Sequence, residues 1–181
     1  MGIFMKKHTL IAGALSMGIL LSTVSFGQQA PSLPVINKAI LFKDIDSLST
    51  RYKYFVVVIF TNYCGGTAQI NDHIRKIDSI TNNQTYYFLC QSTNGWDRRK
   101  LQKILDLYKF NAKVYLIDEQ QYKTKIDHRK QGLFFRNDVC ELCKYEAIGV
   151  PFYIVFDRDK NAILHFYPSN TWEQVLAAII K

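Results

Sequence analysis

Residues 54–67 read YFVVVIFTNYCGGT, and the fold is decided by this stretch. Its first half, Tyr54 to Phe60, is a continuous β-branched and aromatic run, which is typical of a central strand buried on both faces. Cys64 follows, and Gly65-Gly66 predicts a turn. From Thr67 onward, apolar residues recur at helical spacing until the polar residues 81–83 end the helix. The stretch therefore predicts a strand, a turn that carries a cysteine, and a helix.

The flanking sequence predicts further alternating elements. Strands are expected at 85–91, 112–117, 152–156 and 162–167, and helices at 44–53, 96–110, from about 138, and at 170–181. Residues 118–137 are polar and are expected to form an excursion with some helix. The short polar turn at 157–161 predicts an antiparallel hairpin between the last two strands. This order predicts an α/β fold, a mixed β-sheet with helices on both faces.

The start of the chain departs from globular composition. Lys6 and Lys7 precede an uncharged run over 9–26, and Ser25 and Gly27 provide small residues at a cleavage site. The pattern predicts a signal peptide over 1–27, an N-terminal extension over 28–43 and one domain over 44–181. The protein is therefore expected in the periplasm or another exported compartment. An uncleaved N-terminal membrane anchor is the alternative.

The net charge favours no particular macromolecular partner. The chain carries a formal charge of +8, and loss of Lys6 and Lys7 with the signal peptide lowers it to +6. The basic residues are interspersed with acids, and the cluster at 123–130 is typical of a solvated helix face. No nucleic-acid partner is expected, and membrane contact is expected only if the N-terminal segment is retained.

Two motifs resemble the thioredoxin superfamily. Residues 60–67 (FTNYCGGT) look like its strand and C-x-x-C entry, and 145–157 (YEAIGVPFYIVFD) resemble the Gly-Val-Pro-strand segment of periplasmic TlpA-type thioredoxins. The resemblance covers 44–181. It implies that Cys64 occupies the redox position, that Tyr63 replaces a common Trp, and that Pro151 is a cis-proline. It further implies that the Val150 backbone lies beside the cysteine and contacts an extended substrate.

The chemistry of the motif depends on Cys64 and Thr67. A thiol at a helix N-terminus is stabilised as the thiolate, so the pKa of Cys64 is expected below the free value of about 8.5. Thr67 stands where the superfamily has its second, resolving cysteine. Its hydroxyl can hydrogen-bond a thiolate but cannot release a mixed disulfide. Three alternatives follow: a monothiol enzyme, resolution by another cysteine, or a non-catalytic binding or accessory module.

The other cysteines differ in setting. Cys140 and Cys143 form a C-x-x-C, and a helix capped by Asn137 or Asp138 would place both on one face. They are interpreted either as resolving thiols for Cys64 or as a structural disulfide. Cys90 lies within a strand and is expected to be buried.

Metal and peroxide chemistry are less favoured. His73, His128 and His165 show no ligand spacing relative to the C-x-x-C, so no metal or other cofactor is expected. Residues 64–69 (CGGTAQ) also resemble glutathione peroxidases, but the spacing to Gln91 and Trp96 is short. The favoured function is thiol-disulfide exchange through Cys64, with protein thiols or disulfides as partners. The sequence predicts no oligomeric state.

Overall fold

One mixed β-sheet organises the protein. The computed structural model describes residues 32–61, 65–92, 98–122, 130–144, 149–168 and 171–180. Within them, six strands pair in the order β1-β4-β3-β2-β5-β6. The strands are β1 (Val35–Ile36), β2 (Tyr54–Phe60), β3 (Thr85–Gln91), β4 (Val114–Ile117), β5 (Phe152–Phe156) and β6 (Ala162–Phe166). The first four run parallel, and β5 and β6 add antiparallel. The predicted mixed sheet is confirmed.

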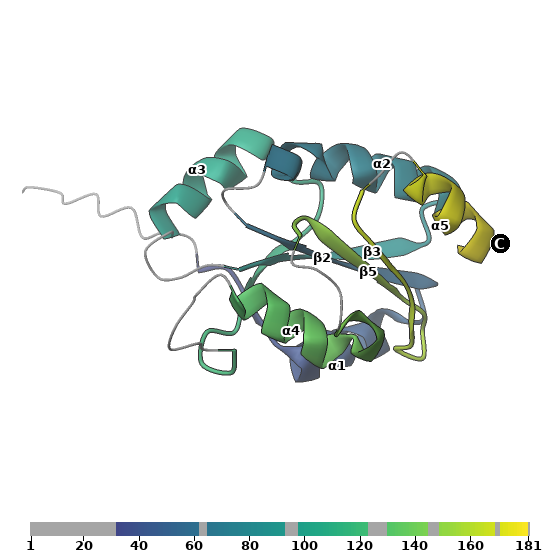
Figure 1. The fold of residues 1–181 in the computed structure, drawn as a ribbon, viewed down its shortest axis with the longest axis horizontal. Helices are drawn as coiled ribbons and strands as arrows, with labels where there is room; N and C mark the ends of the chain where they lie inside the picture. The colour runs from purple at the N-terminus through teal and green to yellow at the C-terminus, as the bar shows by residue number, and fades with distance from the viewer. Residues whose placement is uncertain are drawn as a thin grey trace, which may run out of the picture.

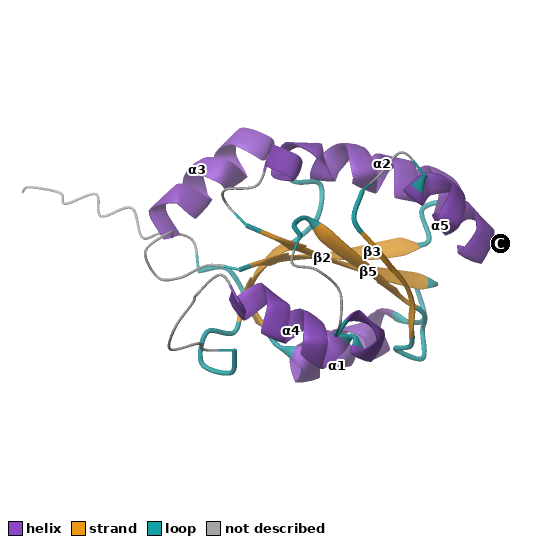
Figure 2. Ribbon diagram, viewed as in Figure 1, coloured by secondary structure: helices purple, strands orange, loops and turns teal. Residues whose placement is uncertain are grey.

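Helices cover both faces of this sheet (Figure 1). Their bounds are α1 (Lys38–Leu48), α2 (Ile70–Thr81), α3 (Arg98–Tyr108), α4 (Gln131–Val139) and α5 (Trp172–Ile180), with short 3-10 segments η1 (Gly65–Gln69) and η4 (Glu141–Cys143). Figure 2 shows α2, α3 and α5 on one side of the strands and α1 and α4 on the other. In the described part of the chain, no helix combines the length and apolarity needed to cross a bilayer.

The central strand β2 separates two hydrophobic clusters. All seven of its residues are buried, as the sequence predicted for a doubly covered strand. Phe55, Val57 and Ile59 face the cluster under α1 and α4. Val56, Val58 and Phe60 alternate with them and face the cluster under α2 and α5. Because successive side chains of a strand point to opposite faces, the sheet keeps the two clusters apart.

The helix after the cysteine motif follows its sequence pattern. Ile70, Ile74 and Ile77 of α2 are buried against the sheet. The helix ends at Thr81, and Asn82 adopts the left-handed conformation (φ 53°) that closes many helices. The predicted end of this helix is confirmed.

The N-terminal part of the fold differs from the prediction over 44–53. Helix α1 begins at Lys38 because the Asn37 side chain caps it, accepting a hydrogen bond from the Ile40 amide at 3.0 Å. Strand β1 precedes it and pairs with β4. The sheet thus includes residues that sequence patterns assign to an N-terminal extension. A two-residue strand carries no periodicity by which the sequence could reveal it.

The predicted start of a helix at about 138 is wrong, and residues 145–148 of that predicted helix lie outside the described residues. Asn137 and Asp138 lie in the last turn of α4 rather than capping a new helix. Cys140 is extended (φ −133°, ψ 101°), so it ends α4 and starts the 3-10 turn η4. The burial of Phe135 and Val139 explains why the helix forms earlier than expected.

Candidate functional site

The structure describes the residues on both sides of the segment that carries Cys64. Thr61 follows β2, and Gly65 begins η1, which runs directly into α2. Tyr63 and Cys64 themselves lie outside the described residues. Since Cys64 is bonded to Gly65, the chain places it between the end of a central parallel strand and the start of a helical segment. Unpaired amides at such a helix start favour an anion.

Thr67 connects the start of this helical segment to β2. Its side chain is 1% exposed, and its hydroxyl donates a hydrogen bond to the Thr61 carbonyl at 3.0 Å. A threonine hydroxyl has one proton, so in this arrangement the oxygen remains only as an acceptor. The sequence allowed the Thr67 hydroxyl to hydrogen-bond a thiolate, whereas the observed bond is directed to the backbone.

Val150 and Pro151 lie at the same end of the sheet as Thr61. The peptide bond between them is cis. Strand β5 follows immediately, and Phe152 pairs with Ile59 near the end of β2. Continuing this antiparallel register brings Val150 to the level of Thr61, and both residues line one cavity.

This cavity lies between the strand ends and α4. Its volume is about 20 Å³, enough for one water molecule. Thr61 and Val150 line it together with Ser92, Gly132 and Arg136. The Gly132 amide donates to the Ser92 hydroxyl at 3.2 Å, which holds α4 against the end of β3. The cavity is too small for a substrate side chain.

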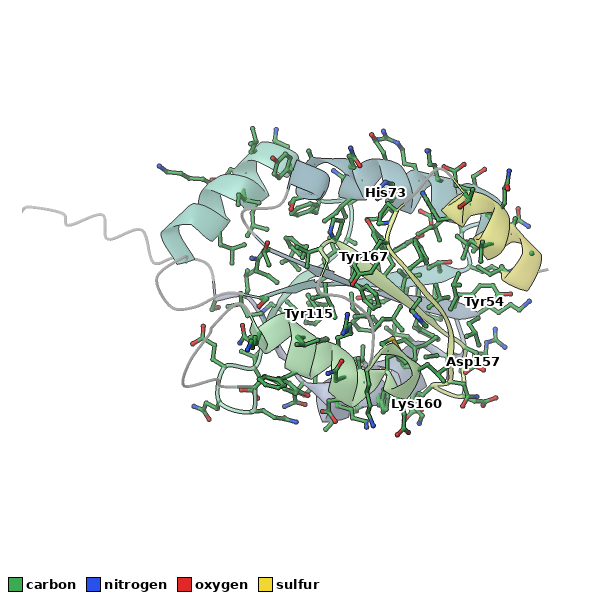
Figure 3. All side chains as sticks on the ribbon, in the orientation of Figure 1. Tyr54, His73, Tyr115, Asp157, Lys160 and Tyr167 are labelled. Carbon is green, nitrogen blue, oxygen red and sulfur yellow. A yellow bond between two sulfur atoms is a disulfide. The ribbon has the colours of Figure 1, made fainter. Side chains whose placement is uncertain are left out.

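A second set of contacts fixes the backbone before Pro151. The Tyr167 hydroxyl accepts hydrogen bonds from the Gly149 amide at 3.0 Å and from the Arg136 guanidinium at 3.3 Å. Arg136 is 3% exposed and lies 5.0 Å from the centre of the Phe152 ring. Tyr167 packs against the hydrophobic cluster under α1 and α4, and Figure 3 labels it beside the strands. Sequence reasoning missed Arg136 and Tyr167, because no motif connects them. Arg136 lies on α4 and Tyr167 directly follows β6, so the two side chains meet only in the tertiary structure.

Cys140 and Cys143 form a disulfide with each other. Their Cα atoms are 5.3 Å apart, and both residues are buried. They belong to the cluster under α1 and α4, whereas α2 packs on the opposite face of the sheet. The sequence left two interpretations of this pair, resolving thiols for Cys64 or a disulfide with each other. The structure contains the disulfide.

His165 lies beside this disulfide. Its ring nitrogen and the two sulfur atoms all lie within 4.8 Å of one another. His165 is on β6 opposite Ile154, whose side chain belongs to the same cluster as the two cysteines. Sequence spacing could not reveal this grouping, because the pairing of the strands brings His165 to the two cysteines.

Cys90 is buried, as predicted. It lies in β3, is 0% exposed and is a free thiol. Burial raises the pKa of the Cys90 thiol. An uncharged, inaccessible thiol is a poor nucleophile, so Cys90 is a core residue.

Comparisons with known proteins identify the fold. Neither a model of a known protein family nor a curated protein sequence matches the chain. The thioredoxin domain of a thiol-disulfide oxidoreductase from Bacteroides vulgatus has a similar structure, with a TM-score of 0.52 at 12% identity over 77% of this chain and 84% of that one. A thiol-disulfide isomerase from Corynebacterium glutamicum aligns with a TM-score of 0.47 at 16% identity, over 74% and 84% of the two chains. The first likeness establishes a thioredoxin-like fold.

Proposed function

We propose that this chain is an exported thiol-disulfide exchange protein that acts through Cys64 as a single nucleophilic thiol. One observation carries the proposal: Thr61, Thr67 and the Val150-Pro151 peptide converge at the end of the sheet to which Cys64 is joined. Export rests on the signal-peptide pattern of residues 1–27. Partners are protein thiols or disulfides.

The reaction begins with the Cys64 thiolate. It attacks one sulfur of a substrate disulfide, the substrate S–S bond breaks, and the second substrate sulfur leaves as a thiolate. The start of the η1–α2 segment lowers the pKa of Cys64 through its unpaired amides. Because Thr67 has no sulfur, a thiol of the substrate or a small external thiol then attacks the mixed disulfide and frees Cys64.

The substrate is expected to lie on the surface as an extended segment. The cavity that the described residues form beside Val150 holds no more than a water molecule. By resemblance to the thioredoxins, we expect the extended substrate to lie along Val150, with Tyr63 as a second contact residue. Gly149, held by Tyr167, fixes where that backbone lies.

Trapping with a thiol reagent tests the proposal. In the full exported chain, Cys64 should alkylate faster at pH 7 than a model peptide thiol, and it should form mixed disulfides with oxidised protein substrates. Cys64→Ser should abolish both, whereas Cys90→Ala, which removes a buried thiol, should change neither. Equal capture of partners by wild type and Cys64→Ser would contradict the proposal.

A non-catalytic binding module is the second candidate. The specific observation in its favour is that the Thr67 hydroxyl already donates to the Thr61 carbonyl and is not available to donate to a thiolate. In that case Cys64 should alkylate no faster than a peptide thiol, and Cys64→Ser should bind partners as well as the wild type.

A further inference from the structure

We propose that Cys140, Cys143 and His165 form a copper(I) site that exists only when the Cys140–Cys143 disulfide is reduced. The three ligand atoms lie within 4.8 Å of one another. Ligand atoms on one ion, with metal–sulfur bonds of about 2.3 Å, are at most about 4.6 Å apart. The two sulfur atoms are bonded to each other in the structure, so once the S–S bond is broken they need to separate by about 2 Å to lie about 4 Å apart on one ion. Rotation about the Cα–Cβ bonds of the two cysteines provides this movement.

The elements hold the three ligands independently. Cys140 ends α4, with its amide bonded to the Arg136 carbonyl at 2.9 Å, and Cys143 ends the η4 turn that follows. His165 is fixed by the β5–β6 pairing, and its ring stacks on Phe152 with centroids 6.0 Å apart. None of these contacts involves the disulfide bond. The backbone arrangement that brings the three ligands together therefore does not depend on that bond.

The chemistry of the ligand set favours copper(I). Two thiolates are soft donors that select copper(I) or zinc, and a neutral imidazole binds both ions. Three protein ligands satisfy copper(I), whereas zinc takes four, with water completing a three-ligand site. Cys140 and Cys143 are 1% and 0% exposed, which disfavours a bound water at the sulfur side.

Reduction controls the site. A dithiol reductant transfers two electrons and two protons to the disulfide, is itself oxidised to a disulfide, and leaves two thiols on the protein. Copper(I) then replaces the two thiol protons, which are released to solvent. While the disulfide is intact, both sulfurs are bonded to each other and neither is a thiolate ligand.

A copper(I) titration tests the inference in the full chain carrying Cys64→Ser and Cys90→Ala. In this background Cys140 and Cys143 are the remaining cysteines, so the result is independent of thiol-disulfide exchange by Cys64. The chain is reduced with dithiothreitol, desalted without oxygen, and titrated against bathocuproine disulfonate. One copper(I) per reduced chain and none per oxidised chain are expected. X-ray absorption should show two sulfur ligands and one nitrogen ligand.

Variants separate this site from unspecific binding. His165→Gln should weaken copper(I) binding about tenfold or more, and Cys140→Ser with Cys143→Ser should abolish it. His73→Gln is the matched control, because His73 packs on the opposite face of the sheet, and it should leave the affinity unchanged. The inference is overturned by equal uptake in the oxidised chain, by an unchanged affinity of His165→Gln, or by preferential uptake of zinc. Loss of the circular dichroism of the fold on reduction would also overturn it.

Discussion

His73 is a buried titratable side chain outside the candidate site. It is 7% exposed, its Nδ1 atom lies 2.7 Å from the Tyr153 hydroxyl, and its ring packs edge-on against Trp172. Figure 3 shows it on α2 above the sheet. Burial lowers the pKa of His73 below its ordinary value of 6.5, and the charge of Lys76 lowers it further. The carboxylates of Asp72 and Glu173 oppose both effects.

The lowered pKa of His73 predicts a pH-dependent stability. Below pH 6.5 the unfolded chain binds a proton at His73 more readily than the folded chain does. Its contribution to the free energy of unfolding is complete above that pH and decreases as the pH falls through the folded-state pKa. Urea unfolding between pH 8 and pH 5 should show this decrease, and His73→Gln should reduce the slope.

Direct titration of His73 by NMR provides the control. Glu173→Gln removes a carboxylate that raises the pKa of His73, so the pKa should fall further in that variant. A midpoint for His73 at or above 6.5 would contradict this account. These effects belong to one residue and do not involve the thiol chemistry.

At the scale of elements, the bounds of α4 were beyond sequence prediction. Its sequence, QGLFFRNDV, carries a weak helical pattern in which Phe134 is exposed while Phe135 is buried. Tertiary hydrogen bonds fix its start: the Gln131 side chain donates to the Ile117 carbonyl at 3.1 Å and accepts from the Ser92 hydroxyl at 3.3 Å. Strands such as β2 and β5 were predictable because each is a continuous apolar run, which indicates a buried strand.

Close packing of α4 on the strand ends predicts the effect of a single methyl group. A Cβ atom at Gly132 would lie 3.1 Å from the Ile59 Cγ2 and 3.3 Å from the Ser92 Cβ. Gly132→Ala should therefore lower the free energy of unfolding by about 1 kcal/mol, because overpacking of about 1–3 kcal/mol exceeds the gain in helix propensity of about 1 kcal/mol. Chemical denaturation measures this change.

Gly65→Ala is the matched control for this effect. A Cβ atom there meets no atom within 4 Å, so its stability should be close to that of the wild type. If Gly132→Ala were as stable as Gly65→Ala, α4 would not be packed closely on β2 and β3.

For the whole molecule, local sequence determined the order of elements, and distant pairing determined which side chains meet. The positions of Thr67, Val150 and Pro151 followed from motifs that lie next to strands. The grouping of His165 with Cys140 and Cys143, by contrast, depends on the β5–β6 register and on the placement of α4. No local pattern carries that information.

The sheet separates the disulfide from the helix that follows Cys64, and this separation gives the last prediction. Cys140 and Cys143 are buried under α1 and α4, while α2 packs on the other face. We expect Cys140→Ala with Cys143→Ala to leave the alkylation rate of Cys64 and its yield of mixed disulfides unchanged. Closing so short a loop stabilises a chain by about 2 kcal/mol in the chain-entropy account, so this variant should lose about that much in denaturant unfolding and stay folded. Accumulation of mixed disulfides at Cys64 in single Cys140→Ser or Cys143→Ser variants would instead assign the resolving role to this pair, because a trapped intermediate builds up only when its attacking thiol has been removed.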